Sequence, residues 1–255
     1  MSLIKKTVAF VFSLYGFLVF LAVMFLLLPL FIIAFLQKPL KGGNNVIRLA
    51  GIWADVFFFM TGIRSSIIYE SAHDPGREYI FVSNHISYID IPMMVKVIRR
   101  QHYRVLGKAE MAKVPVFGSI YRRGAVIVNR ENAEARKKSV EKLIKFINKK
   151  ISVFICPEGT FNMTHKPLKF FYDGAFRIAI ETQKPIKPIL FLDTYARLNY
   201  KSIFSLNPGI SRAVFLSETF TEGLTIDDLP FLKEKIFLQM EEALIHYKAG
   251  WIREE

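Results

Sequence analysis

The sequence of 255 residues is long enough for one sizeable domain with an appendage, and 52% of its residues are hydrophobic. The net charge of +13 suits nucleic acid, an anionic bilayer or a phosphorylated substrate alike, so charge alone selects none of these partners. A single cysteine, Cys156, excludes an internal disulfide and is compatible with a reducing compartment.

The N-terminal part contains an apolar segment from Thr7 to Leu36 that has no charged residue. About 20 apolar residues suffice to span a bilayer, whereas the apolar core of a secretory signal peptide has only about 7–15. We therefore expect a retained membrane anchor. Pro29 interrupts the segment, so it either crosses the bilayer or bends and dips into one leaflet. Basic residues on both sides leave the orientation open.

A second apolar segment runs from Leu49 to Ile63, after a turn predicted at Lys41–Asn45. With about 15 residues it is short for a membrane span. We expect it to pack against the first segment or to lie in the membrane interface, and a buried helix of the globular domain is the alternative. Residues 1–64 are thus predicted to form a membrane-anchoring helical hairpin.

From Ser65 onwards, short apolar runs alternate with amphipathic helical patterns. Strands are predicted at Ile67–Tyr69, Tyr79–Val82, Val126–Val128, Val153–Ile155, Ile186–Leu192 and Val214–Leu216. Helices are predicted at Ile91–Arg100, Glu131–Lys150, Gly174–Thr182 and Asp227–Lys248, and Tyr195–Ser211 is predicted to be a loop. This alternation predicts an α/β domain over residues 65–255, with a mixed, mostly parallel sheet covered by helices.

A histidine and an aspartate follow the predicted strand Tyr79–Val82. Pro92 places the next helix start near Asp90, which leaves His85 in the preceding loop. Residues five apart within one helix point about 140° away from each other, so the two side chains can meet only in this arrangement. Asp90 would then hold one imidazole nitrogen while the other accepts a proton from a substrate hydroxyl. A chance pair without chemistry is the alternative.

Two further turns follow predicted strands, at the sheet edge where such folds gather their sites. Arg130 ends the run that starts at Gly124, and its guanidinium suits a phosphate, although a plain surface charge is the alternative. The turn Pro157–Thr160 exposes backbone N–H groups that can hold an anion or a developing oxyanion. Cys156 before it fits a buried structural cysteine better than a nucleophile.

The other histidines have no partners at metal-ligand spacing, and neither a nucleotide-binding glycine loop nor a nucleic-acid motif is present in the sequence. We therefore expect no metal and no nucleic-acid partner.

Four blocks, in this order, resemble the glycerolipid acyltransferase family, which includes the 1-acyl-sn-glycerol-3-phosphate acyltransferases. The blocks are Asn84-His85 with Asp90 and Ser87; Gly124 with Arg130, preceded by Lys108; Pro157-Glu158-Gly159-Thr160; and Pro185 with Pro188. The resemblance covers about residues 79–192 and follows an apolar N-terminus.

The resemblance implies acyl transfer from acyl-CoA or acyl carrier protein to a lysophospholipid, with 1-acyl-sn-glycerol-3-phosphate as the expected acceptor. It implies that His85 and Asp90 are catalytic and that substrate is bound by Asn84, Ser87, Lys108, Gly124, Arg130, Glu158, Gly159 and Thr160. It implies no cofactor beyond the acyl donor, membrane lipid as a partner, and a place in the inner membrane with the domain on the cytoplasmic face.

Two aromatic residues stand where the family usually has a basic residue. Phe161 replaces an arginine credited with gripping the acceptor phosphate, and Tyr172 replaces a lysine. Arg130, Lys108 or Lys169 could supply the missing charge. A lyso-lipid with another head group is therefore an alternative acceptor, and a non-catalytic lipid-binding membrane protein of the same fold is a further alternative.

Overall fold

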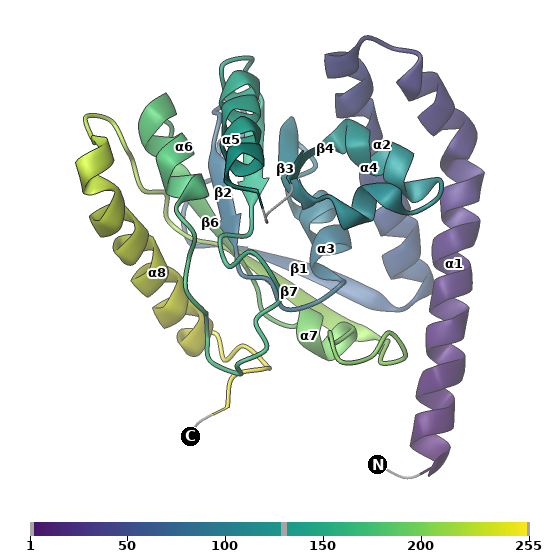
Figure 1. Cartoon of the computed structure of the whole chain (residues 1–255). Coiled ribbons are helices and arrows are strands. Elements are labelled where there is room, and N and C mark those ends of the chain that lie inside the picture. The colour runs from purple at the N-terminus through teal and green to yellow at the C-terminus, as the bar shows by residue number, and fades with distance from the viewer. Residues whose placement is uncertain (1–2, 129–131, 254–255) are drawn as a thin grey trace.

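The structure is a computed structural model that describes residues 3–128 and 132–253. It contains a seven-stranded sheet with the order β1-β7-β6-β2-β5-β3-β4 (Figure 1). The strands are β1 (Ile63–Tyr69), β2 (Ile80–Ser83), β3 (Tyr103–Lys108), β4 (Ala125–Val128), β5 (Ser152–Ile155), β6 (Ile186–Phe191) and β7 (Gly209–Phe215). The helices are α1 (Leu3–Phe35), α2 (Pro39–Met60), α3 (Asp90–Val97), α4 (Phe117–Gly124), α5 (Ala133–Ile147), α6 (Gly174–Thr182), α7 (Thr194–Arg197) and α8 (Leu229–His246), with short 3₁₀ turns at Glu110–Lys113 and Ile226–Asp228.

The sheet is mixed and mostly parallel, as predicted. Strands β6, β2, β5, β3 and β4 run in one direction, while β7 pairs antiparallel with β6 and parallel with β1. In the register, Ile80 of β2 lies opposite both Val153 of β5 and Ile186 of β6. The carboxyl ends of β6, β2 and β5 therefore lie side by side at the same end of the sheet.

Helices cover both faces of the sheet. Successive side chains of a strand point to opposite faces, so neighbouring residues of β2 pack against different helices. Ile80 and Val82 pack with α5, α6 and α8, whereas Phe81 packs with α2, α3 and α4. Figure 1 shows α5, α6 and α8 on one side of the strands and α2, α3 and α4 on the other. All four residues of β2 are buried, as expected for a strand covered on both faces.

The two N-terminal helices form a hairpin whose second helix joins the core of the α/β unit. The indole Nε1 of Trp53 in α2 donates to the carbonyl of Phe20 in α1 at 3.2 Å. One stripe of α1 is buried, whereas the opposite side is exposed and apolar, with Leu26 77% exposed. Within the described residues, α1 is the one helix long and apolar enough to cross a bilayer, over Lys6–Phe35. The predicted domain boundary after residue 64 stays a prediction.

The turn predicted at Lys41–Asn45 is wrong, because these residues lie inside α2. The glycines there serve close packing. A Cβ on Gly43 would lie 2.7 Å from the carbonyl oxygen of Arg123, and one on Gly42 would collide with the carbonyl of Ala34. The glycine pair therefore lets α2 approach its neighbours closely and does not end the helix.

Other element boundaries differ from the predicted ones. Strand β3 was not predicted, and β1 begins at Ile63, four residues before its predicted start. The predicted loop Tyr195–Ser211 includes most of α7 and the first residues of β7. Helix α5 begins at Ala133, where the side chain of Asn132 accepts the N–H of Glu134 at 2.9 Å. The predicted start of this helix at Glu131 lies outside the described residues.

Candidate active site

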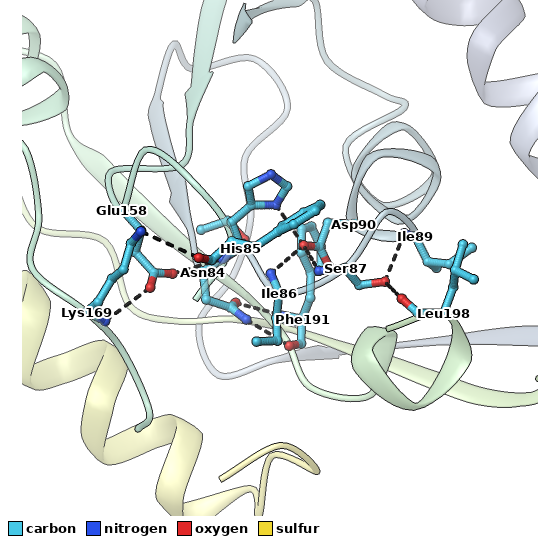
Figure 2. A network of polar contacts seen from close by, with 12 residues as sticks. Asn84, His85, Ile86, Ser87, Ile89, Asp90, Glu158, Lys169, Phe191 and Leu198 are labelled. Atoms are coloured by element: carbon cyan, nitrogen blue, oxygen red, sulfur yellow. Dashed lines mark hydrogen bonds and ion pairs between the residues drawn. The ribbon is translucent and has the colours of Figure 1, made fainter. Parts of the chain in front are cut away.

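The loop between β2 and α3 brings His85 and Asp90 into contact. Asp90 is the first residue of α3, and its Oδ2 lies 2.8 Å from Nδ1 of His85. The Asp90 side chain is 1% exposed and the His85 side chain 16%. Nε2 of His85 has no hydrogen-bond partner in the described part of the chain, and Figure 2 shows the ring directed away from the loop. The imidazole thus has one nitrogen held and one available.

The Asp90 carboxylate also organises the loop backbone. Its Oδ2 accepts the N–H of Ile86 at 2.7 Å and the N–H of Ser87 at 2.9 Å, in addition to Nδ1 of His85. Its Oδ1 is buried and has no hydrogen-bond partner among the described residues. Three donors on one oxygen hold the carboxylate in a single position. Asp90 is therefore both the partner of the imidazole and the residue that closes the loop.

Two side chains fasten this loop to the rest of the site. Nδ2 of Asn84 donates to the carbonyl of Phe191 at 3.0 Å, and Oδ1 of Asn84 accepts the N–H of Phe191 at 2.9 Å. This reciprocal pair connects the ends of β2 and β6. Oγ of Ser87 donates to the carbonyl of Leu198 and accepts the N–H of Ile89. Asn84 and Ser87 therefore position the loop of His85 and Asp90 by binding backbone groups of Phe191, Leu198 and Ile89.

Glu158 holds the loop from the β5 side. Its Oε1 accepts the N–H of His85 at 2.9 Å, and its Oε2 accepts the N–H of Lys169 at 3.1 Å (Figure 2). The residue is fully buried. Burial raises the pKa of Glu158 to about 7, against the opposing effect of these two N–H donors and of the nearby Lys169 charge. Glu158 thus supports the backbone of His85 and is not in hydrogen-bond contact with the imidazole.

The turn predicted at Pro157–Thr160 is present, but one of its N–H groups is occupied. Gly159 has a φ of 74° and its N–H donates to the carbonyl of Cys156 at 3.0 Å. Oγ1 of Thr160, an exposed residue, accepts a hydrogen bond from Nζ of Lys169. The Gly159 amide therefore serves the turn itself, and Thr160 brings a lysine ammonium group to this edge of the site.

An aromatic group stands next to the imidazole where the resemblance expects an arginine. The ring of Phe161 lies 4.4 Å from the ring of His85 and 5.0 Å from that of Tyr88, as measured between centroids. The ring of Tyr200 lies 6.3 Å from that of Phe161 by the same measure. These contacts hold the imidazole by packing, in addition to its bond with Asp90.

Two predicted binding residues come from parts of the fold that do not adjoin the loop of the pair. Lys108 ends β3, which is separated from β2 by β5. Gly124 precedes β4, so it lies at the amino ends of the parallel strands, whereas the loop of His85 lies at their carboxyl ends. Gly124 packs against Ile47 of α2. Arg130 lies outside the described residues. The structure thus groups Asn84, His85, Ser87, Asp90 and the 158–160 turn.

Several members of the site were not predicted from the sequence, because they act through backbone groups. The N–H of Asn162 donates to the carbonyl of His85 at 2.8 Å, and Phe191 and Leu198 contribute backbone atoms. For Asn162 a signal exists: its Oδ1 accepts the N–H of Thr164 at 3.0 Å, a turn that Asn favours. In the described part of the chain, no three His, Cys, Asp or Glu side chains are grouped as metal ligands would be.

An apolar cavity of about 80 Å³ lies beside the start of α3. Its lining comes from α1, α2, α3 and α4 and includes Trp53, Ile91 and Pro92. Ile91 and Pro92 directly follow Asp90. Known ligand pockets measure about 300–1,000 Å³, so this cavity would need to widen to hold a long chain.

The fold and the site define an α/β protein with a long apolar N-terminal helix and a His–Asp pair at the carboxyl ends of the strands of a mostly parallel sheet. A family model described as Acyltransferase matches residues 65–192. The chain belongs to this acyltransferase family, which confirms the resemblance found in the four sequence blocks.

The similar proteins carry consistent names. The chain is 26% identical over 208 residues to human 1-acyl-sn-glycerol-3-phosphate acyltransferase beta, which covers 80% of the chain and 74% of that protein. It is 28% identical over 180 residues to the human alpha protein, of which it spans 62%. The crystal structure of the 1-acyl-sn-glycerophosphate acyltransferase PlsC from Thermotoga maritima matches with a TM-score of 0.73 and 20% identity, over 98% of the chain and 99% of that structure. This last similarity shows the shared fold.

Proposed function

We propose that the protein transfers a fatty acyl group from acyl-CoA or acyl carrier protein to the free hydroxyl of 1-acyl-sn-glycerol-3-phosphate. The observation that carries this proposal is the 2.8 Å contact between Nδ1 of His85 and Oδ2 of Asp90, which leaves Nε2 for a substrate proton. The names of the similar proteins support this choice of acceptor. The proposal includes no metal and no cofactor besides the acyl donor.

In this mechanism Nε2 of His85 removes the proton of the acceptor hydroxyl. The oxygen attacks the thioester carbonyl, a C–O bond forms, and the C–S bond breaks as the tetrahedral intermediate collapses. The leaving thiolate takes the proton from the imidazolium ion, so His85 returns to its starting state. Asp90 stabilises the imidazolium ion at 2.8 Å. General-base catalysis of this kind contributes about 10² to 10⁴ in rate.

Lys169 is the residue that we propose for holding the acceptor phosphate in place of the absent arginine. Its Nζ donates to Oγ1 of Thr160 and lies 3.5 Å from the carbonyl oxygen of Phe161. The ammonium group is therefore next to the backbone from which the family's arginine would extend. An ammonium group is a suitable phosphate ligand, although it lacks the fork of an arginine.

The role of Lys169 has a direct kinetic test. Lys169→Met should raise the KM for the phosphate acceptor by about 10- to 100-fold with little change in kcat, since a charge-assisted hydrogen bond is worth about 1.5–3 kcal/mol. Lys166→Met, an exposed lysine of the same segment, is the matched control. An unchanged KM in Lys169→Met would refute this role of Lys169 and leave Lys108 or Arg130 as the residue that binds the phosphate.

The apolar cavity beside Ile91 supports a place for an acyl chain close to the catalytic pair. The exposed apolar side of α1 supports a membrane location. We propose the inner membrane, with the α/β domain on the cytoplasmic face where acyl-CoA and acyl carrier protein are available.

A second acceptor class is favoured by one observation, the Phe161 ring packed on His85. An aromatic residue there suits a lyso-lipid whose head group is not a phosphate. A panel of lyso-lipids with one acyl donor distinguishes the two acceptor classes, and a strong preference for 1-acyl-sn-glycerol-3-phosphate would eliminate the second.

The reaction itself is tested by His85→Ala, assayed by thiol release from acyl-CoA in the presence of acceptor. We expect turnover to fall by about 10² to 10⁴ while the protein stays in the membrane fraction. His246→Ala, an exposed histidine on α8, should retain wild-type turnover. Wild-type turnover in His85→Ala would refute the proposed role of the imidazole.

A further inference from the structure

Residues 197–207 form a compact loop that begins at the last residue of α7. The N–H of Asn207 donates to the carbonyl of Arg197 at 2.8 Å and closes the loop at its base. Inside it, the N–H of Asn199 donates to Oγ of Ser205 at 3.0 Å, and the N–H of Phe204 to Oγ of Ser202 at 3.1 Å. Neighbouring ends and internal hydrogen bonds are typical of an Ω-loop, which keeps its shape at the surface of a protein.

This loop is attached to α1. The N–H of Leu206 donates to Oγ of Ser13 at 3.0 Å, and Leu206 is 5% exposed. The Leu206 side chain fills the space that a Cβ on Gly16 would occupy. The rings of Phe204 and Phe10 lie 4.9 Å apart. Figure 1 shows the chain after α7 extending toward α1, in agreement with these contacts.

The tip of the loop is apolar and exposed. Ile203 is 62% exposed and Phe204 44%, although both are large hydrophobic residues. They continue the exposed apolar side of α1, where Phe10 is 46% and Phe17 56% exposed. Lys201 next to them is exposed and basic. A continuous apolar surface with a basic residue at its margin is the composition of membrane-interface segments.

We propose that the tip of the 197–207 loop inserts into the lipid bilayer beside α1, with Ile203 and Phe204 at the level of the acyl chains and Lys201 at anionic head groups. The bilayer is the occupant because the tip is continuous with α1, the helix long and apolar enough to enter a membrane. The loop is thus a second membrane contact, distant in sequence from the helical hairpin.

The same loop is connected to the catalytic pair. Oγ of Ser87 donates to the carbonyl of Leu198, and Ser87 and Asn199 form an isolated antiparallel bridge. The N–H of Ser87 in turn binds Oδ2 of Asp90. Lipid contact at Ile203 therefore sets the position of the His85–Asp90 loop relative to the bilayer that holds a lipid acceptor. This last step rests on the proposed function, whereas the insertion does not.

The insertion is tested with an environment-sensitive NBD fluorophore attached to a single cysteine, introduced by Ile203→Cys or by Phe231→Cys in a Cys156→Ala background. The full chain is reconstituted in phosphatidylcholine–phosphatidylglycerol vesicles. Phe231 is 66% exposed on α8, on the far side of the sheet from α1, and is the matched control. We expect the label at position 203 to emit at shorter wavelength and to be quenched by spin-labelled lipid, and the label at position 231 to be quenched by aqueous iodide.

Iodide quenching at position 203 as strong as at position 231 would overturn the proposal. Shielding from iodide at position 203 without quenching by spin-labelled lipid would also overturn it, because another protein chain would then cover the loop. These readings do not depend on acyl transfer, so they decide the insertion even if the proposed reaction is wrong.

The connection to the site has a separate test. In Ile203→Glu/Phe204→Glu, turnover on acceptor in vesicles should fall by about tenfold, because charged side chains cannot replace the buried apolar area. Turnover on the same acceptor in detergent micelles should stay close to that of the wild type, and Phe231→Glu should match the wild type in both. Wild-type turnover of the double variant in vesicles would overturn the connection, and so would an equal loss in vesicles and micelles, because the loss would then not depend on the bilayer.

Discussion

The charge of Asp90 can be separated from its hydrogen bonds by Asp90→Asn. An asparagine oxygen in the place of Oδ2 can still accept the N–H groups of Ile86 and Ser87 and Nδ1–H of His85. The variant removes the negative charge 2.8 Å from the imidazole. Opposite unit charges at that distance attract by about 6 kcal/mol at an effective dielectric constant of about 20, and partial exposure of His85 reduces this value.

In the proposed mechanism the imidazolium ion forms only as the hydroxyl proton is removed, so the loss should appear in kcat and leave the KM for both substrates close to the wild-type value. We expect kcat to fall by about 10² to 10⁴. The amide nitrogen would replace the buried, unpartnered Oδ1 and lower the free energy of unfolding by about 1–3 kcal/mol. Thiol release from acyl-CoA measures the first effect and denaturant unfolding the second.

A matched control is Asp173→Asn, which removes a carboxylate that is 57% exposed and paired with Lys233 at 2.7 Å. It should keep wild-type turnover. A folded Asp90→Asn variant with turnover within about tenfold of the wild type would refute the role of Asp90 as counter-charge, since general-base support exceeds that factor.

Further variants test packing, loop attachment and pH dependence. Gly43→Ala should lower the free energy of unfolding by about 1–3 kcal/mol in a denaturant titration. Alanine has the better helix propensity, but its Cβ would lie 2.7 Å from the Arg123 carbonyl oxygen. Gly51→Ala is the control and should be neutral or stabilising, because its Cβ would lie 3.5 Å from the nearest atom. Asn84→Ala should cost about 2–4 kcal/mol and reduce kcat, because it leaves the buried Phe191 N–H and carbonyl unpaired; equal stability would contradict this. The pKa of Glu158 is raised from 4.5 in the unfolded chain to about 7, so the folded protein binds the extra proton between these values and the free energy of unfolding should fall by up to about 3 kcal/mol as pH rises through that range. Glu158→Gln should show no such fall, and an identical pH slope in both proteins would contradict the assignment.

The contact between His85 and Asp90 was predictable because it is local. Five residues and one helix start determine it, and Pro92 marks that start. The contact of His85 with Glu158 joins residues 73 apart and depends on β2 and β5 being neighbours in the sheet. Loops that follow parallel strands lie at the same end of a sheet, but the sequence does not state which strands are neighbours, so the contact between His85 and Glu158 was not predicted.

The misread segments share a physical cause, since packing decided them against local preference. Gly42-Gly43 has the composition of a turn, yet both glycines lie inside α2, where their missing side chains allow the close approach of Ala34 and Arg123. Strand β3 contains Arg104, which is 2% exposed. Its guanidinium donates to Oδ1 of Asn44 at 2.9 Å. A buried arginine of this kind breaks the apolar pattern by which strands are found in a sequence.

The arrangement of the loop explains why the Asn-His-x-x-x-x-Asp block specifies so few residue types. Between His85 and Asp90, the residues at positions 86 and 87 supply backbone N–H groups to the carboxylate, and any residue type except proline can supply these. The side chain of Ile86 is 1% exposed and packs in the core, so its type is set by packing. The carboxylate, the imidazole and the Asn84 amide act through their side chains, and these are the residues that the Asn-His-x-x-x-x-Asp spacing retains. The Ser87 hydroxyl also acts through its side chain, because it binds the Leu198 carbonyl and the Ile89 N–H. Lengthening the segment by one residue would keep all three side chains yet displace the N–H groups from Oδ2, which is why the spacing carries as much information as the residue types.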